Sequence, residues 1–241
     1  MKPSYGLSYM GSKTLMCGDV PIVRRPKLID LFGGGGALAH YLATHGAGVV
    51  LYNDINPAIV AAFVAALTGR YQQSLPVPAT KAERQAAAAT DPVVAAICCF
   101  KPTWIEQGFA VEPNIFRKRT NRFHRLFAAG IADRVICTCA DYRAFAQLRA
   151  DPSVGWYVDP PYRDGGGYAD ECSFDWRWAA DIAGPVVGFD SFVPDGFRML
   201  WRRDHTMLRN SATTTTFCFW KKASINAEID DFECATQCQL L

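Results

Sequence analysis

The chain has 241 residues, half of them hydrophobic and a fifth charged, and its formal net charge at pH 7 is +2. This length can bury a core as one large domain or as a domain with an insertion, and the nearly balanced charge neither indicates nor excludes a polyanionic partner. No apolar run approaches the roughly 20 residues of a membrane helix, so we expect no membrane span.

The nine cysteines are scattered, odd in number and not preceded by a signal peptide. This pattern argues against a disulfide framework and favours a reducing, cytoplasmic location. The neighbouring pairs Cys98 with Cys99 and Cys137 with Cys139 lack the two-residue gap of a zinc site. We therefore expect no metal.

The first part of the chain alternates between strand-like and helix-like segments. Residues 27–32 form a short apolar run that ends in four glycines at 33–36, and residues 37–43 have helical periodicity. A second buried strand is predicted over 48–54, followed by a helix over 56–67. Strand, helix, strand and helix in this order predict a parallel sheet.

The alternation is lost between residues 69 and 130, where five prolines interrupt the pattern. We interpret this stretch as an insertion in which the Ala-rich residues 81–90 form a helix. Its end, residues 116–125, has the densest positive charge of the chain, interleaved with aromatic residues. These cations are candidates for phosphate contacts, with a solvated helix face as the alternative. They are Arg117, Lys118, Arg119, Arg122 and Arg125.

Further strands are predicted after the insertion. They cover residues 134–139, 155–159, 185–189 and 213–220, the last as an edge or hairpin strand. The whole pattern predicts an α/β fold with a Rossmann-like, doubly wound, mostly parallel sheet and a small inserted subdomain. The predicted division is a catalytic domain of residues 1–68 and 131–222, an insertion at 69–130 and a tail at 223–241.

Four carboxylates fall at the predicted strand ends, where open parallel sheets bind their ligands: Asp30, Asp54, Asp141 and Asp159. A glycine turn lets a ligand approach the backbone, and an acid after the second strand is placed to accept hydrogen bonds from ribose hydroxyls. Together they predict a cofactor that contains a nucleoside. A tight turn without a ligand, Asp54 as a helix N-cap and a nicotinamide dinucleotide are the alternatives.

The tetrapeptide Asp159-Pro160-Pro161-Tyr162 favours one kind of chemistry. Two prolines stiffen the turn and remove amide donors, so its carboxylate and carbonyl oxygens can accept the hydrogens of an amine on a planar base. Such an amine becomes a better nucleophile when its lone pair points at a methyl donor. Tyr162 supplies an aromatic face for a base taken out of its stack. A rigid turn with a buried aromatic residue is the alternative.

At this point the sequence resembles the Dam-type DNA adenine-N6 methyltransferases, over most of the chain. The motifs that carry the resemblance, in order, are Ser8-Tyr9-Met10-Gly11-Ser12-Lys13, Asp30-Leu31-Phe32-Gly33-Gly34-Gly35-Gly36, Asn53-Asp54-Ile55-Asn56, Ala140-Asp141-Tyr142 and the catalytic tetrapeptide. The resemblance implies that S-adenosylmethionine is the methyl donor and double-stranded DNA the substrate, in a bacterial or phage-infected cell. It implies no obligatory protein partner.

The resemblance also assigns roles to single residues. Tyr9 and Lys13 would line the methionine end of the donor, and the other cofactor-binding residues would be Asp30, Phe32, Gly33, Gly35, Asp54, Ile55, Asp141, Tyr142 and Asp159. Asp159, Pro160, Pro161 and Tyr162 would be catalytic. Arg163 begins a glycine-rich segment that we expect to close over the extruded base and to contact nucleic acid.

The insertion departs from the family pattern, since it looks shorter and Phe109-Ala110-Val111-Glu112-Pro113 only partly echoes the family's target-reading motif. We therefore predict a short or relaxed target sequence. Cytosine N4 or an adenine in RNA is the alternative substrate, because the tetrapeptide suits any such amine. A nucleic-acid-binding protein that has lost transferase activity is the alternative outside enzymes.

Overall fold

The computed structural model describes residues 4–7, 12–46, 48–70, 80–91, 93–95, 113–162, 174–206, 213–221 and 232–233. The strands are β1 (Ile22–Val23), β2 (Lys27–Asp30), β3 (Val49–Asn53), β4 (Val135–Thr138), β5 (Val154–Val158), β6 (Val186–Asp190), β7 (Arg198–Thr206), β8 (Thr213–Lys221) and β9 (Phe232–Glu233). The α-helices are α1 (Ala37–His45), α2 (Pro57–Leu67), α3 (Lys81–Thr90), α5 (Pro113–Ala128) and α6 (Trp176–Ala180). Short 3-10 helices are η1 (Lys13–Leu15), η2 (Cys17–Asp19), η4 (Ala132–Arg134) and η5 (Tyr142–Ala150).

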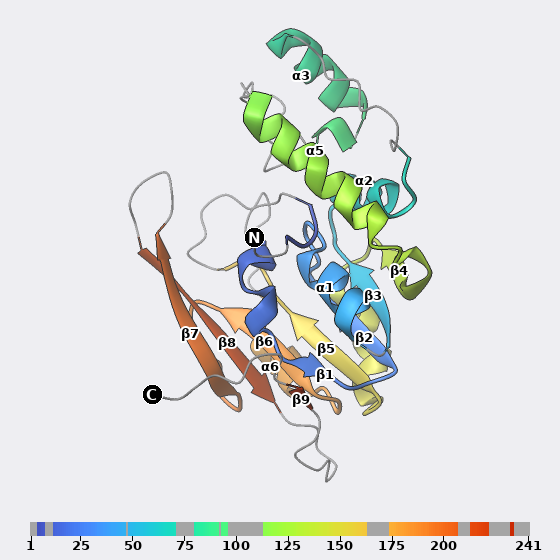
Figure 1. Cartoon of the computed structure of the whole chain (residues 1–241). Helices are drawn as coiled ribbons and strands as arrows, with labels where there is room; N and C mark the ends of the chain where they lie inside the picture. The colour runs from blue at the N-terminus through green and yellow to red at the C-terminus, as the bar shows by residue number, and fades with distance from the viewer. Residues whose placement is uncertain are drawn as a thin grey trace.

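A seven-stranded sheet in the order β4-β3-β2-β5-β6-β8-β7 forms the centre of the protein (Figure 1). Its first five strands are parallel, whereas β8 runs antiparallel to both of its neighbours. From β2 the chain builds outward to β4 and then returns to place β5 on the other side of β2. The predicted doubly wound, mostly parallel sheet is confirmed.

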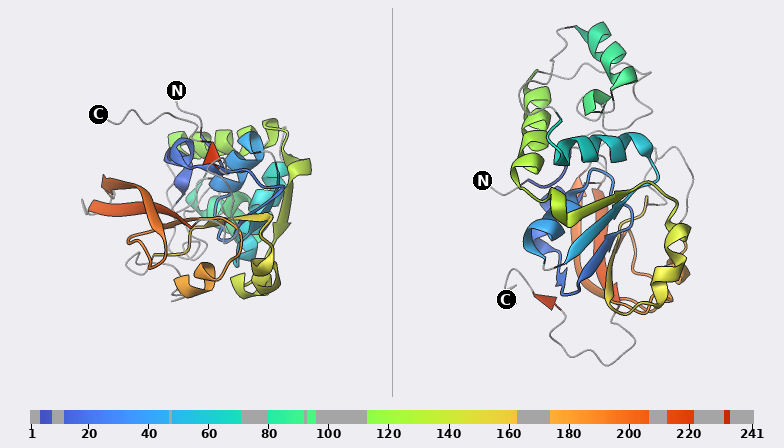
Figure 2. Two further views of the ribbon diagram at one scale, coloured as in Figure 1. Left: turned by 90° about the horizontal axis from the view of Figure 1, so that it is seen from below. Right: turned by 90° about the vertical axis from the view of Figure 1, so that its right-hand side faces the viewer.

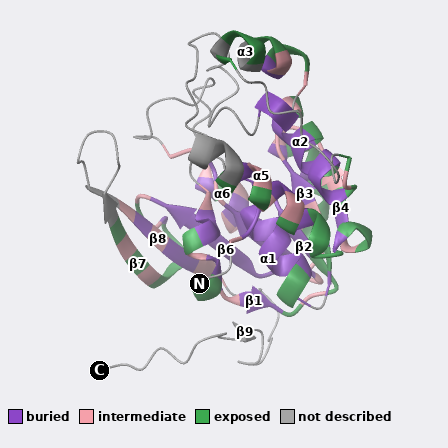
Figure 3. Ribbon diagram, turned by 45° about the horizontal axis from the view of Figure 1, so that its top comes forward, coloured by how far each residue is buried: buried purple, intermediate pink, exposed green. Residues whose placement is uncertain are grey.

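Helices cover both faces of the sheet (Figure 2). One hydrophobic cluster joins α1, α2 and part of α5 to one face, and a second joins η5 and α6 to the other. Neighbouring side chains of β2 show the division, because Leu28 belongs to the first cluster and Ile29 to the second. The strands at the centre of the sheet are therefore buried on both faces (Figure 3).

Local capping fixes the starts of two helices. Asn56 accepts a hydrogen bond from the Ala58 amide at 3.0 Å, and Pro57 occupies the first helical position of α2. At α3 the Thr80 hydroxyl accepts from the Glu83 amide while the Glu83 carboxylate accepts from the Thr80 amide. Both helices cover the residues that the sequence predicts.

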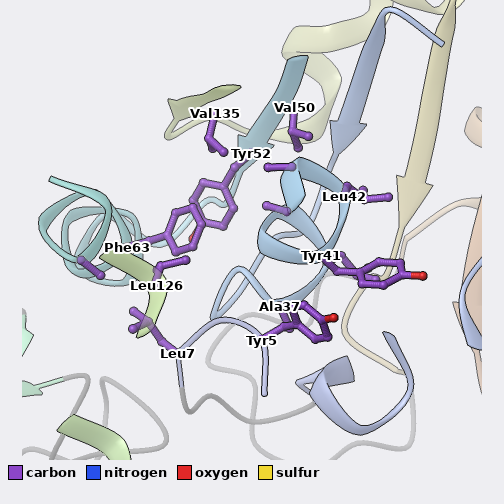
Figure 4. Close-up of a cluster of buried hydrophobic side chains, with 14 of the residues drawn as sticks. Tyr5, Leu7, Ala37, Tyr41, Leu42, Val50, Tyr52, Phe63, Leu126 and Val135 are labelled. Atoms are coloured by element: carbon purple, nitrogen blue, oxygen red, sulfur yellow. The ribbon is translucent and has the colours of Figure 1, made fainter. Parts of the chain in front are cut away.

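Helix α5, which the sequence analysis does not assign, contributes to the core although it lies in the predicted insertion. Its Phe123 and Leu126 side chains are buried in the same cluster as α2. Figure 4 shows Leu126 in this cluster together with Phe63 and Tyr52, whose rings stack at 4.3 Å. The other end of α5 stands with α3 above the edge at which the parallel strands end (Figure 1).

Three details differ from the expected strands. The Thr-rich strand β8 is an interior strand, paired with β6 on one side and with β7 in a hairpin on the other, so only the hairpin alternative is correct. The edge strand is β7, which is not among the predicted strands. Within the predicted tail, β9 pairs with β1, another strand that the prediction lacks.

Two phenylalanines one turn apart on α5 test its place in the core. Phe123 is 1% exposed and Phe127 is 36% exposed. We expect Phe123→Ala to lower the free energy of unfolding by about 3–5 kcal/mol and Phe127→Ala by about 1–2 kcal/mol. Chemical denaturation measures both. Equal effects would contradict the packing of α5 against α2.

Candidate active site

The carboxyl ends of the parallel strands bring the predicted acids to one edge of the sheet. Asp30 is the last residue of β2, Asp54 follows β3 and Asp159 follows β5. Asp141 lies three residues beyond the end of β4. Because β2 and β5 are neighbours from which the chain builds in opposite directions, the edge between Asp30 and Asp159 is the topological switch point where such sheets bind ligands.

The glycine turn joins β2 to α1 and is tied to the end of β3. The Gly33 amide donates to the Asn53 carbonyl at 2.6 Å, and the Gly34 amide donates to Asp54 Oδ2 at 2.8 Å. A Cβ at Gly33 would lie 2.2 Å from the Tyr52 ring, and Gly36 has a φ of +70°. Side chains are therefore excluded from both positions, and the turn keeps its backbone close to β3.

Asp54 is held by the backbone rather than acting as a helix cap. Its Oδ1 accepts from the Asn56 amide at 2.8 Å, and Asn56 itself caps α2. The N-cap alternative for Asp54 is therefore wrong. Burial raises the pKa of Asp54, while the amides of Asn56 and Gly34 oppose that shift. Each carboxylate oxygen has a second lone pair that can accept from a hydroxyl, and the neighbouring Ile55 side chain is 59% exposed.

Asn53 ties three strand ends together from a buried position. Its Nδ2 donates to the carbonyls of Leu31 and Ala140, each at 3.0 Å. Its Oδ1 accepts from the Thr138 hydroxyl and the Ala140 amide. All four hydrogen-bonding positions of the amide are used, so this side chain fixes the ends of β2, β3 and β4 relative to one another.

Asp30 is completely buried beside the start of α1. Its Oδ2 accepts from the Ala39 amide at 3.0 Å, and its Oδ1 has no hydrogen-bond partner within the part of the chain that the structure describes. Burial, together with the negative charge of Asp159, raises the pKa of Asp30 to about 8, although the Ala39 amide opposes the shift. The group is therefore mainly protonated at neutral pH.

An ion pair with little exposure to solvent joins Lys13 to the Asp159–Tyr162 turn. Lys13 Nζ lies 2.6 Å from Asp159 Oδ2, and the two side chains are 5% and 14% exposed. The same ammonium lies over the Tyr162 ring, 5.1 Å from its centroid. The Tyr162 hydroxyl donates to Asp159 Oδ1 at 3.4 Å. Residues 146 positions apart in the chain therefore meet at one carboxylate.

Burial raises the pKa of the Asp159 carboxyl, and the Lys13 ammonium opposes this. Burial alone would lower the pKa of Lys13, but the attraction of Asp159 raises it above its usual range. Burial also raises the pKa of Tyr162 to about 12. The Lys13 ammonium is therefore the neighbour that favours the ionised form of Asp159 against the effect of burial.

Three residues beside this turn are not among the predicted site residues. Phe189 of β6 places its ring centroid 5.6 Å from Lys13 Nζ, and Thr216 of β8, which is 1% exposed, opposes the rise in the pKa of Tyr162. Asp190, the last residue of β6, accepts from the Trp176 indole at 2.8 Å and raises the pKa of Asp159. Neither strand carries a sequence motif that marks these positions, although Asp190 is one more acid at a strand end.

The remaining predicted cofactor residues lie along the same edge. Phe32, in the glycine turn, has its ring 5.8 Å from that of Tyr142. Asp141 caps η5 by accepting from the Arg143 amide at 2.8 Å and forms an exposed ion pair with the Arg143 side chain. Tyr9 lies outside the described residues.

The basic segment forms part of α5. Lys118 and Arg125 are exposed and Arg122 is partly buried, so these three side chains, at positions i, i+4 and i+7, share one face. Arg119 is only 6% exposed, which leaves it little access to a phosphate. The Arg117 side chain and Arg163 lie outside the described part of the structure.

The described residues contain no group of three or more His, Cys, Asp or Glu side chains arranged to hold a metal ion. Among the described helices, none is long and apolar enough to cross a membrane.

No protein-family model and no curated protein sequence matches the chain. Similar solved structures include a conserved hypothetical protein from Streptococcus pyogenes, with 9% identity, a TM-score of 0.42 and coverage of 83% of this chain and 89% of that one. A candidate methyltransferase from Escherichia coli has 12% identity, a TM-score of 0.40 and coverages of 83% and 77%. A candidate RNA methyltransferase from Pyrococcus horikoshii has 11% identity, a TM-score of 0.39 and coverages of 83% and 76%. Similarities of this size decide neither activity nor substrate.

The raised pKa of Asp30 predicts how stability depends on pH. An unfolded Asp has a pKa of about 3.9, so between about pH 4 and 8 the folded state holds a proton that the unfolded state has lost. The contribution of the Asp30 carboxyl to the free energy of unfolding of the wild type therefore falls as pH rises from about 4 to 8. Asp30→Asn removes this titration, so its free energy of unfolding should increase relative to wild type from pH 5 to pH 8. Parallel denaturation curves of both proteins at the two pH values would contradict the prediction.

Proposed function

We propose that the protein is an S-adenosylmethionine-dependent methyltransferase that acts on the exocyclic amine of a nucleobase. The observation that carries the proposal is the Asp159-Pro160-Pro161-Tyr162 turn at the switch point of the sheet, beside a glycine turn that is tied to Asp54. Proline at 160 and 161 removes two amide donors from the turn and leaves its carbonyl and carboxylate acceptors. The turn therefore suits a ligand that donates hydrogens from an amine.

The residues along the edge fit the methyl donor. A glycine turn whose backbone packs closely against the Tyr52 and Phe63 rings, a carboxylate at Asp54 and the exposed apolar surface of Ile55 suit a nucleoside that carries a ribose. Within the part of the chain that the structure describes, the buried Asp30 Oδ1 has no hydrogen-bond partner, which supports a polar ligand at the switch point. S-adenosylmethionine would supply an electrophilic methyl group on a sulfonium.

The chain's own groups would orient the nucleophile. The Asp159 carboxylate and the Pro160 carbonyl accept the two amine hydrogens and so turn the nitrogen lone pair toward the methyl carbon. A nitrogen–carbon bond forms as the carbon–sulfur bond breaks, and its electron pair stays on sulfur. The methylated nitrogen then releases one proton, which the Asp159 carboxylate can accept and pass to water.

We propose adenine N6 in double-stranded DNA as the substrate. The support for this choice is the order in which the motifs from Lys13 to Tyr162 follow one another along the chain. Cytosine N4 has the same conjugated amine and remains the alternative outcome of the assay described next, as does adenine in RNA. The target base would have to leave its stack to reach a turn at the edge of the sheet.

We also propose that the exposed cationic face of α5 contacts the phosphate backbone. Burial and the neighbouring charge of Arg125 lower the pKa of Arg122, so this face holds cations that repel one another. Phosphate groups would relieve that repulsion. Helices α5 and α3 stand above the edge that carries the catalytic turn (Figure 1), on the side from which a base would enter.

Transfer of tritium from labelled donor to unmodified DNA tests the activity. We expect label at N6 of adenine, and a fall of at least about 100-fold for Asp159→Asn because the carboxylate no longer accepts the amine hydrogen. The control is Asp195→Asn, an exposed acid beyond β6. Label only on cytosine, or only on RNA, would identify that nucleic acid as the substrate in place of adenine in DNA. Absence of label from every nucleic acid would contradict the proposal.

Charge removal on α5 tests the phosphate contacts. The triple variant Lys118→Gln, Arg122→Gln and Arg125→Gln should bind duplex DNA more weakly, and the slope of log affinity against log salt should become shallower by about 2–3. The control, Arg198→Gln, lies at the opposite end of the sheet because β7 runs parallel to β6. An unchanged slope in the triple variant would exclude this face.

A further inference from the structure

The Lys13 ammonium occupies the position that the proposed function gives to the target amine. It donates to Asp159 Oδ2 at 2.6 Å, and it lies over the face of Tyr162 on which a base would stack. Both features of the amine site, the acceptor and the aromatic platform, are therefore engaged by one side chain of the same protein.

On the basis of the proposed function, we propose that Lys13 is a positioning residue and a placeholder, by which we mean a side chain that occupies the position of the target amine until the substrate binds. It keeps the buried Asp159 ionised while the site is empty of substrate, and it yields its place on Oδ2 and Tyr162 to the target amine. This role differs from lining the methionine end of the donor, which is the role implied by the sequence motif.

The electrostatics of the turn explain why a placeholder is needed. Asp159 is buried, and the Asp190 carboxyl raises its pKa further, so without a neighbouring cation it would tend to take up a proton. A protonated Asp159 would lose half of its acceptor character toward an amine. Lys13 is the cation that lies in contact with it.

Lys13 is suited to holding the place and not to being methylated there. Its contact with Asp159 raises its pKa, so the nitrogen keeps its proton and has no free lone pair to attack a methyl carbon. Its ammonium also lies near two aromatic faces, those of Tyr162 and Phe189, which favour the charged form.

The backbone that carries Lys13 is fixed, so movement is confined to the side chain. The Thr14 hydroxyl accepts from the Tyr5 amide at 2.8 Å and donates to the Tyr5 carbonyl at 2.9 Å. The Trp201 indole donates to the Asp19 carbonyl at 2.8 Å, and Arg203 forms an ion pair with the Asp19 carboxylate at 2.5 Å. A lysine stem has enough rotatable bonds to withdraw its ammonium while its Cα stays in place.

The test compares Lys13→Met, Lys13→Arg and the control Lys27→Met, an exposed lysine at the start of β2. For each protein, single-turnover methylation of genomic DNA is followed against pH at saturating donor. We expect the acid side of the pH–rate profile of Lys13→Met to move to higher pH by at least about one unit. The reason is that the loss of an adjacent cation raises the pKa of a carboxyl by about 1–3 units. The limbs of Lys13→Arg and Lys27→Met should stay within about half a unit of wild type.

The second readout is the KM for DNA at alkaline pH, where Asp159 is ionised in every variant. A placeholder competes with the base, so Lys13→Met should lower this KM, by about tenfold or less if the competition is worth about 1.4 kcal/mol. An acid limb that coincides with wild type would overturn the proposal. So would a raised KM for DNA, because Lys13 would then contact the substrate rather than yield to it.

Infrared spectroscopy as a function of pH tests the role of Lys13 independently of methyl transfer. The carbonyl stretch of protonated Asp159, identified by its loss in Asp159→Asn, should appear at higher pH in Lys13→Met than in wild type. This measurement decides the ionisation even where Lys13→Met has no turnover. If wild type labels no nucleic acid but the stretch shifts as expected, the proposed function fails while the control of Asp159 by Lys13 stands. No shift of the stretch would overturn that control directly.

Discussion

The parallel pairing of β2 with β5 places two carboxyl groups at one end of the sheet, Asp30, which is completely buried, and Asp159, which is 14% exposed. Two buried negative charges at this edge would oppose folding. The protein meets the constraint in two different ways. Asp30 keeps its proton and accepts a hydrogen bond from the start of α1, whereas Asp159 pairs with Lys13. The two acids therefore differ in their surroundings, since Lys13 favours the ionised form of Asp159 while burial and Asp159 favour the protonated form of Asp30.

The N-terminal segment connects these groups to the rest of the fold. The Leu7 amide donates to the Gly35 carbonyl at 2.6 Å, so the segment crosses the glycine turn before it reaches Lys13. Beyond Lys13 it is held by Trp201 and Arg203 of the edge strand β7. The N-terminal segment thus contacts the glycine turn, Asp159 and the edge strand β7. Asn53 has the corresponding effect on the other half of the edge, where it joins the ends of three strands.

The parts of the fold that local signals determine could be predicted from the sequence. Helices α2 and α3 carry their caps at Asn56 and Thr80, and the strands before Asp30, Asp54 and Asp159 are short apolar runs. Helix α5 was missed because arginines and lysines hide its apolar stripe, in which Phe123 and Leu126 are three residues apart. The strand β7 was missed because it has three arginines, no regular alternation and only one neighbour in the sheet.

The contacts within the candidate site could not be predicted in the same way, because they join distant parts of the chain. Asp159 and Tyr162 are recognisable from their motif, but Thr216 and Phe189 come from strands whose residues look like ordinary sheet residues. The Lys13–Asp159 pair depends on burial and on register across 146 positions. A buried ion pair contributes little net stability, because desolvation of both groups offsets their attraction. In the function that we propose, its value therefore lies in the charge that it maintains on Asp159, one of the two acceptors that would bind the amine.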